Sequence, residues 1–153
     1  MAYKTQEALG YQINLTALMV RQEFGRRIAY LGIAPEQFGI LFFLNQNPGM
    51  TQTEIALAIC KNKTTVTRMM DALVRKGLIT KEWNRDDRRT QSIKMTREGK
   101  EILEEACPIG EEMTADLQAL LSPEEQKMIF GALVKIQNFC KIGCATHAEK
   151  TSK

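Results

Sequence analysis

The chain has 153 residues, 44% of them hydrophobic and 25% charged, which is typical of one globular domain and argues against a disordered protein. No apolar run approaches the roughly 20 residues that a transmembrane helix needs, and the first residues lack the order of a secretory signal. We therefore expect a single domain over residues 1–153, located in the cytoplasm and without a membrane partner. The four cysteines are too sparse for a disulfide scaffold, so reduced thiols are expected.

The net charge of +3 is distributed unevenly along the chain. Residues 61–100 hold 12 Lys or Arg against 5 Asp or Glu, whereas the rest of the chain holds 9 against 13. One segment therefore carries the positive charge, which indicates a partner rich in phosphate. A solvated basic face would give the same pattern.

Two helices are predicted before residue 50. Apolar residues three or four apart from 7 to 31 predict a long helix that ends at Gly32. Pro35 suits the first turn of a second helix, which ends before residues 47–49. Its predicted buried side consists of Phe38, Leu41, Phe42 and Leu44.

Two shorter helices follow. Thr51 and Glu54 form a capping box at the start of a helix from about 51 to 59. Asn62 is a good N-cap for the next helix, which runs to about residue 76 and ends at Gly77. The turn between them contains Cys60, for which we favour a small buried residue over a thiol activated by the helix N-terminus and Lys61.

A β-hairpin and two further helices complete the predicted elements. Segments 78–83 and 90–95 suit strands, with a charged run between them. Thr96 caps a fifth helix, and Ser122 to Glu125 form a second capping box that opens a sixth. The terminal helices, 7–31 and 101–145, carry more apolar surface than a small core covers, which predicts an interface between two copies of the chain.

Two short helices followed by a charged hairpin is the order of a winged helix-turn-helix, and all three parts lie in or beside the basic segment. In such a module the second helix enters the major groove of DNA by its N-terminal half. We expect Lys63, Thr64, Thr65 and Arg68 on its outward side. Arg68 suits two parallel hydrogen bonds to guanine, and Lys61 and Lys63 suit phosphate contacts.

The hairpin tip is rich in arginine. A narrow minor groove attracts an inserted guanidinium, so Arg88 or Arg89 is expected to enter it. Asp87 would orient an arginine through a bidentate pair, or alternatively cap the turn.

Four motifs in this order resemble the multiple-antibiotic-resistance regulator (MarR) family: residues 63–68, 73–79, 85–89 and 95–99. The resemblance covers about residues 7–144 and implies a mainly α fold with a β-hairpin wing, formed by six helices. The DNA-binding lobe would span about 35–100, and the N- and C-terminal helices would interlock in a homodimer. It also implies a repressor that binds a pseudo-palindromic operator of double-stranded DNA, and it adds Thr67 and Arg85 to the expected DNA contacts.

Family members typically release DNA when a small phenolic or anionic ligand binds between the dimer helices and the DNA-binding lobe. Tyr11, Tyr30, Phe38 and Phe42 are the aromatic candidates for such a site, although aromatic residues at helical spacing also serve as core. No cofactor is expected.

Three other functions are weighed against this hypothesis. Cys140, Cys144 and His147 are spaced i, i+4 and i+7, so they could hold a soft metal in a thiol- or metal-responsive regulator, or else pack at the dimer interface. A winged helix that binds only proteins is a second alternative, which a hairpin with three arginines disfavours. An enzyme is not expected, because the chain has one histidine and no nucleophile or phosphate-loop motif.

Overall fold

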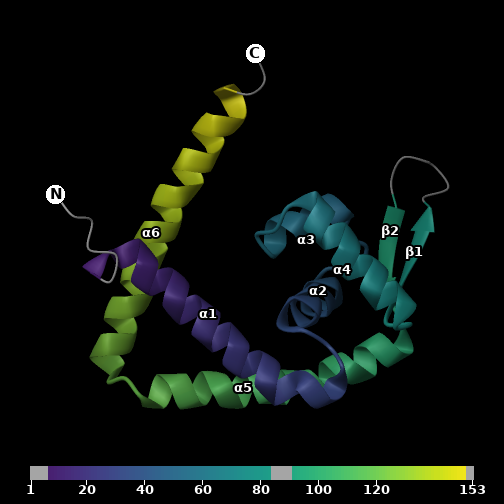
Figure 1. The fold of residues 1–153 in the computed structure, drawn as a ribbon, viewed down its shortest axis with the longest axis horizontal. Coiled ribbons are helices and arrows are strands. Elements are labelled where there is room, and N and C mark those ends of the chain that lie inside the picture. The colour runs from purple at the N-terminus through teal and green to yellow at the C-terminus, as the bar shows by residue number, and fades with distance from the viewer. Residues whose placement is uncertain (1–6, 84–90, 151–153) are drawn as a thin grey trace. The chain divides into compact units, whose positions relative to one another are not determined.

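The computed structural model describes residues 7–83 and 91–150, and it describes side chains as far as residue 141. Figure 1 shows a mainly helical chain with one small hairpin. The elements in order are α1 (Leu9–Ile28), a 3-10 helix η2 (Ala29–Leu31), α2 (Pro35–Gln46), α3 (Gln52–Ala58), α4 (Lys63–Arg75), β1 (Ile79–Trp83), β2 (Gln91–Met95), α5 (Arg97–Ala119) and α6 (Pro123–Lys150). The predicted six helices and hairpin are confirmed.

The chain divides into two compact units, residues 1–111 and 112–153. The first unit holds the helices α1 to α4, the hairpin and the first part of α5. The second unit holds the end of α5 and all of α6, which continues to Lys150 and so runs five residues past the predicted bound of 145.

The predicted caps set the starts of three helices. The backbone N–H of Thr51 donates to Glu54 at 2.7 Å, and the N–H of Glu54 donates back to the Thr51 hydroxyl at 3.3 Å. Asn62 accepts from the N–H of Thr65 at 2.8 Å. In the second unit, Ser122 and Glu125 form the reciprocal pair at 2.8 and 3.2 Å. These contacts satisfy backbone donors that a helix end leaves unpaired, which explains why the boundaries were predictable.

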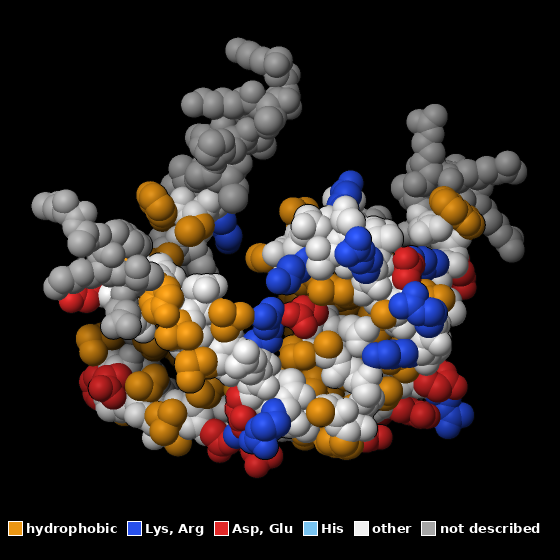
Figure 2. Space-filling model, viewed as in Figure 1, with side chains coloured by type: hydrophobic (Ala, Val, Ile, Leu, Met, Phe, Trp, Pro, Cys, Tyr) orange, Lys and Arg blue, Asp and Glu red, His pale blue; other side chains and the backbone are white. Residues whose placement is uncertain are grey.

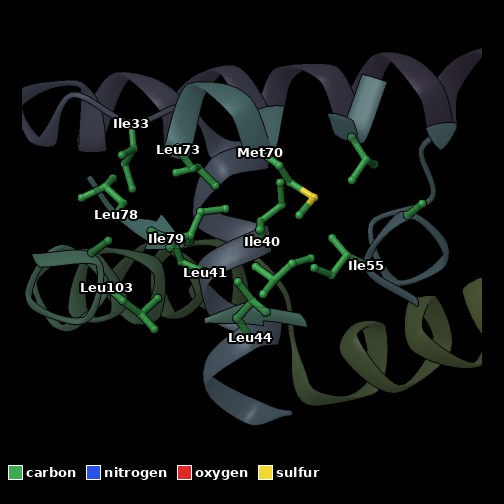
Figure 3. Close-up of a cluster of buried hydrophobic side chains, with 14 of the residues drawn as sticks. Ile33, Ile40, Leu41, Leu44, Ile55, Met70, Leu73, Leu78, Ile79 and Leu103 are labelled. Carbon is green, nitrogen blue, oxygen red and sulfur yellow. The ribbon is translucent and has the colours of Figure 1, made fainter. Parts of the chain in front are cut away.

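The hydrophobic core of the first unit lies between α2, α4, the hairpin and the start of α5 (Figure 3). Its fully buried side chains include Ile40 and Leu41 of α2, Met70 and Leu73 of α4, and Ile79 of β1.

The predicted buried side of α2 is partly wrong. Ile40 is buried there with Leu41 and Leu44, whereas Phe42 is 38% exposed and Phe38 only packs against the core. The segment from Ile40 to Leu44 is apolar without interruption, so periodicity alone does not choose its inner face.

A close backbone contact fixes the hairpin to α5. The strands pair antiparallel with Ile79 opposite Met95. The N–H of Thr96 donates to the carbonyl of Leu78 at 3.0 Å, and the Thr96 hydroxyl donates to the carbonyl of Gly77 at 2.6 Å. A β-carbon on Gly99 would lie 2.1 Å from the carbonyl oxygen of Leu78, so this approach requires glycine at position 99.

Apolar side chains stay exposed on the helices at both ends of the chain. Leu9, Leu15 and Met19 of α1 are exposed, as are Phe130 and Val134 of α6. In the described part of the chain, no single helix is long and apolar enough to cross a membrane, and the one pair that passes jointly, Leu9–Leu31 with Pro35–Gln46, is bent by 79°.

Candidate nucleic-acid interface

Helices α3 and α4 are joined by a turn of four residues, Ile59 to Asn62. Within it Cys60 adopts a φ of 52°, the left-handed region that non-glycine residues rarely occupy. The N–H of Lys61 then donates to the carbonyl of Ala56 at 3.0 Å, which closes the turn. Cys60 is exposed, so the prediction of a small buried residue at this position is wrong.

Helix α4 has a buried side and a polar side. Val66, Met70 and Leu73 are buried against the core. Thr64 and Arg68 are exposed on the opposite side, Thr65 is half-buried, and Lys63 is exposed as the first residue of the helix. Figure 2 shows lysine and arginine side chains over the part of the molecule that α3 and α4 occupy. The N-terminal half of α4 therefore presents polar and cationic groups to solvent.

Some cations of the basic segment are paired with carboxylates, and others are not. Lys81 pairs with Asp71 at 2.5 Å, and Lys94 pairs with Glu82 at 2.6 Å, so the charges at the base of the hairpin are neutralised. By contrast, no carboxylate of a described residue lies within 4.0 Å of the exposed cations Lys61, Lys63 and Arg68, or of Arg75 in the last turn of α4. The unneutralised positive charge thus lies on α4 and the turn before it, where a phosphate-bearing partner would be attracted.

The Thr67 hydroxyl is already engaged inside the protein. It donates to the carbonyl of Lys63 at 2.8 Å and accepts a hydrogen bond from the side-chain amide of Gln52 in α3. A hydroxyl carries one hydrogen, so Thr67 has no donor left for a phosphate. Thr67 therefore differs from the exposed Lys63, Thr64 and Arg68 on the same helix.

Two further contacts hold α4 in the first unit. The ammonium of Lys76 donates to the carbonyl of Gly32 at 2.6 Å and to the amide oxygen of Gln37 at 2.9 Å. Gln37 is 8% exposed, and its amide oxygen also accepts from the N–H of Ala34 at 3.2 Å. The pair Asp71–Lys81 ties α4 to β1.

Sequence reasoning missed Gln37, Gln52 and Lys76, each of which holds α4 in place. The one available signal was Gln37, a polar residue beside the apolar run of its helix.

The predicted residues of the hairpin tip, Arg85, Asp87, Arg88 and Arg89, lie outside the described residues. The strands that lead to the tip are described, and Trp83 faces Gln91 as the last pair of the ladder. The hairpin itself is thus confirmed, and the roles of its tip residues stay predictions.

The four aromatic ligand candidates do not form one cluster. The ring of Phe38 lies 6.0 Å from that of Phe42 and 5.0 Å from that of Phe24. Tyr30 is 72% exposed in η2. Tyr11 lies about 20 Å from Phe24 along α1, at a rise of about 1.5 Å per residue. The structure thus brings Phe38 and Phe42 together and leaves the tyrosines apart from them.

Two surface hollows of the first unit, of about 260 and about 490 Å³, meet at Asn45 at the end of α2. None of the four aromatic candidates lines either hollow. Cys107 lines the smaller one, and burial, followed by the nearby charge of Glu111, raises the pKa of its thiol. Such a thiol is less reactive than an exposed one at neutral pH.

Of the three residues considered as metal ligands, Cys140 is exposed on α6, and the side chains of Cys144 and His147 lie outside those described. The helical path of α6 to Lys150 keeps the i, i+4 and i+7 spacing on one face. Among the described residues no other group of three histidine, cysteine or carboxylate side chains could hold a metal ion.

Known proteins resemble the chain in both sequence and structure. The model of the MarR family matches residues 33–90. The transcriptional regulator HosA of Escherichia coli O127:H6 is 28% identical over 102 residues, which cover 67% of this chain and 76% of HosA.

Two solved structures share the fold over most of the chain. A MepR–DNA complex of S. aureus has a TM-score of 0.79 and 26% identity, covering 88% of this chain and 98% of MepR. The repressor CouR bound to a 23-mer DNA duplex has a TM-score of 0.78 and 28% identity, covering 90% and 99%. CouR has also been solved with p-coumaroyl-CoA. With the winged helix-turn-helix described above, these similarities show that residues 33–90 match the MarR family and that the chain shares its fold with the DNA-bound proteins MepR and CouR.

Proposed function

We propose that the protein is a transcription regulator that binds double-stranded DNA with α4 in the major groove. The observation that carries the proposal is the N-terminal half of α4, where Lys63, Thr64 and Arg68 are exposed and the cations have no neutralising carboxylate among the described residues. Side chains of this kind on the N-terminal half of a recognition helix reach base edges and phosphates. The DNA complexes of MepR and CouR, which share this fold, support the assignment.

In this proposal Arg68 reads a base, and Lys61 and Lys63 contact phosphates. Thr64 and Thr65 lie beside them and suit contacts to phosphates or to thymine methyl groups. Arg88 or Arg89 of the hairpin tip enters the flanking minor groove. Arg85 and Asp87 support the same contact.

The regulator acts as a homodimer and as a repressor. Exposed Leu15 and Met19 of α1, and Phe130 and Val134 of α6, offer the apolar surface that a stable dimer buries. Two recognition helices related by a two-fold axis would read a pseudo-palindromic operator with half-sites one helical turn apart. CouR, a transcriptional repressor of the same fold, supports the repressor role.

A small phenolic or anionic effector releases the DNA. The support is the complex of CouR with p-coumaroyl-CoA, an anionic thioester of a phenolic acid. Phe38 and Phe42 are the candidates for an effector site that the structure brings together, and Tyr11 and Tyr30 would need another site or the second subunit. We propose cytoplasmic action without enzymatic activity, in keeping with relatives that are named as regulators.

Two other functions would give different experimental results. A winged helix that binds only proteins would show no preference among DNA duplexes. A thiol- or metal-responsive regulator would retain zinc or copper through Cys140 and Cys144 after purification, and its DNA affinity would change on chelation or oxidation.

The proposal is tested with Arg68→Ala and Lys63→Ala, measured against the preferred duplex and a scrambled duplex over a range of salt. Arg68→Ala should reduce the binding free energy by about 1–3 kcal/mol for the preferred duplex and by much less for the scrambled one, because a base contact carries the specificity. Lys63→Ala should weaken binding of the two duplexes similarly. It should also reduce the slope of log affinity against log salt by about one, as the loss of one phosphate contact predicts.

The matched control is Arg97→Ala, which removes an exposed arginine paired with Glu101 at the start of α5. Replacing both Arg88 and Arg89 by alanine should lower affinity and flatten the salt dependence further. Unchanged binding by Arg68→Ala and by the double variant would contradict the assignment of the interface.

A further inference from the structure

The side chain of Gln52 links the two helices of the helix-turn-helix. Gln52 is the first residue of α3, and its side chain leaves that helix to reach α4. Its amide nitrogen donates to the Thr67 hydroxyl and lies 3.5 Å from the carbonyl oxygen of Lys63. The contact joins residues that are 15 positions apart in the chain.

The orientation of the Gln52 amide follows from its two partners. The carbonyl of Lys63 only accepts hydrogen bonds, so the group that faces it must be the NH₂. The single hydrogen of the Thr67 hydroxyl points to the same carbonyl at 2.8 Å, which leaves the hydroxyl oxygen to accept from Gln52. The N–H donors of the Gln52 amide and the O–H donor of Thr67 therefore each have a defined acceptor.

Both partners of Gln52 lie at the N-terminal end of α4, the end that carries the exposed Lys63, Thr64 and Arg68. The buried contacts of Met70 and Leu73 hold the middle of the helix to the core, and the ammonium of Lys76 holds its C-terminal end to Gly32. The Gln52 amide is thus the polar contact that ties the DNA-facing end of α4 to α3.

We propose that Gln52 is a positioning residue for DNA reading, acting through Thr67. The link would set the angle between α3 and α4, and with it the depth at which Arg68 enters the major groove. Small errors of position at such a contact weaken base recognition more than they weaken phosphate binding, because hydrogen bonds to base edges are directional. Thr67 accordingly serves inside the protein and not as a DNA contact. This inference rests on the proposed function.

The test is a double-mutant cycle in the full chain with Gln52→Met and Thr67→Val, which keep side-chain size and remove the hydrogen bonds. The quantity measured is the ratio of the dissociation constants for the preferred duplex and a scrambled duplex of equal length. Each single variant should lower this preference about three- to tenfold, as the loss of one hydrogen bond predicts. The double variant should lose no more of this preference than the more affected single variant, because the two changes remove the same link.

Two controls accompany the cycle. Gln46→Met removes an exposed glutamine at the end of α2, and it should leave the preference unchanged. Thr67→Ser keeps the hydroxyl and should retain the wild-type preference. A nuclear Overhauser contact between the Gln52 amide and the Thr67 methyl group should be present in the free protein and should not depend on DNA.

Three results would overturn the inference while leaving the proposed function intact: additive losses in the double variant, a loss with Thr67→Val alone, or no loss with either variant. A loss with Thr67→Val alone would mean that Thr67 touches DNA directly. A wild-type protein without preference for any duplex is a different result, since it would remove the proposed function itself.

Discussion

Among the glycines of the described chain, Gly99 leaves the least room for a side chain. A β-carbon there would lie 2.1 Å from the carbonyl oxygen of Leu78 and 2.9 Å from the side chain of Met95. The backbone oxygen cannot move without loosening the junction between β1 and α5, where it accepts from the N–H of Thr96.

We therefore expect Gly99→Ala to lower the free energy of unfolding by about 3 kcal/mol, at the upper end for overpacking. Denaturant titration at fixed protein concentration measures this change. Gly10→Ala is the matched control, because nothing lies within 4 Å of its β-carbon position and alanine favours a helix, so a gain below about 1 kcal/mol is expected. A Gly99→Ala protein as stable as the wild type would show that the contact is wrong.

Cys60 occupies a backbone conformation that suits glycine. Its φ of 52° crowds a β-carbon against the following carbonyl. Cys60→Val should lower the free energy of unfolding by about 1–2 kcal/mol, because a branched side chain is poorly tolerated there. Cys60→Gly should leave it unchanged or raise it by up to about 1 kcal/mol. Thermal melting of both variants checks this order of stability, and a Val variant more stable than the Gly variant would contradict it.

At the scale of elements, an ion-pair cluster lies on α1. Two nitrogens of Arg26 donate to Glu23 at 2.9 and 2.7 Å, and Arg27 donates at 2.8 Å. These hydrogen bonds, from Arg26 first and then Arg27, lower the pKa of Glu23 from 4.5 to about 2.

The lowered pKa gives a pH dependence with a definite sign. The stabilisation from Glu23 is fully present above about pH 4.5 and is lost as the pH falls toward 2, because the unfolded chain binds the proton first. Carboxyl NMR should report a midpoint for Glu23 near 2. Glu23→Gln should remove this part of the acid dependence of stability, whereas Glu112→Gln should retain it. A Glu23 midpoint near 4.5 would show that the cluster is absent in solution.

Sequence alone predicted those elements whose signals are local. Thr51, Asn62 and Ser122 each bond to backbone within three residues, so the capping patterns predicted these helix starts correctly. The charge pattern likewise predicted which side of α4 faces solvent, because Arg68 lies opposite the apolar positions of the same helix.

The remaining features depend on contacts between elements. The link from Gln52 to Thr67 exists only because packing brings the start of α3 beside the first turns of α4, and no spacing rule reports that approach. The sequence predicted Thr67 as a DNA contact and gave no signal that its hydroxyl bonds to Gln52 and to the carbonyl of Lys63. In α2, Ile40 and Phe42 compete for burial within one apolar run, and the packing of the whole unit decides between them.

At the scale of the molecule, the exposed apolar surface of the terminal helices predicts the oligomeric state. Analytical ultracentrifugation should give twice the chain mass of 17.3 kDa. Replacing Phe130 and Val134 by glutamate should produce a monomer that keeps its helical content and loses DNA affinity, because the two side chains are exposed one turn apart on α6.

Lys135→Glu is the control for that double variant, since it changes the net charge by the same amount on another side of α6. A dimer that survives the Phe130 and Val134 changes would exclude this face of α6 from the interface.

The central claim is that the protein reads DNA sequence through α4, and one measurement tests it most directly. Purified protein is used to select bound fragments from a pool of random double-stranded DNA at physiological salt, where non-specific phosphate binding is weak. The account predicts enrichment of an inverted repeat with half-sites about one helical turn apart, and loss of that enrichment in Arg68→Ala. A folded, dimeric protein that enriches no sequence would contradict it.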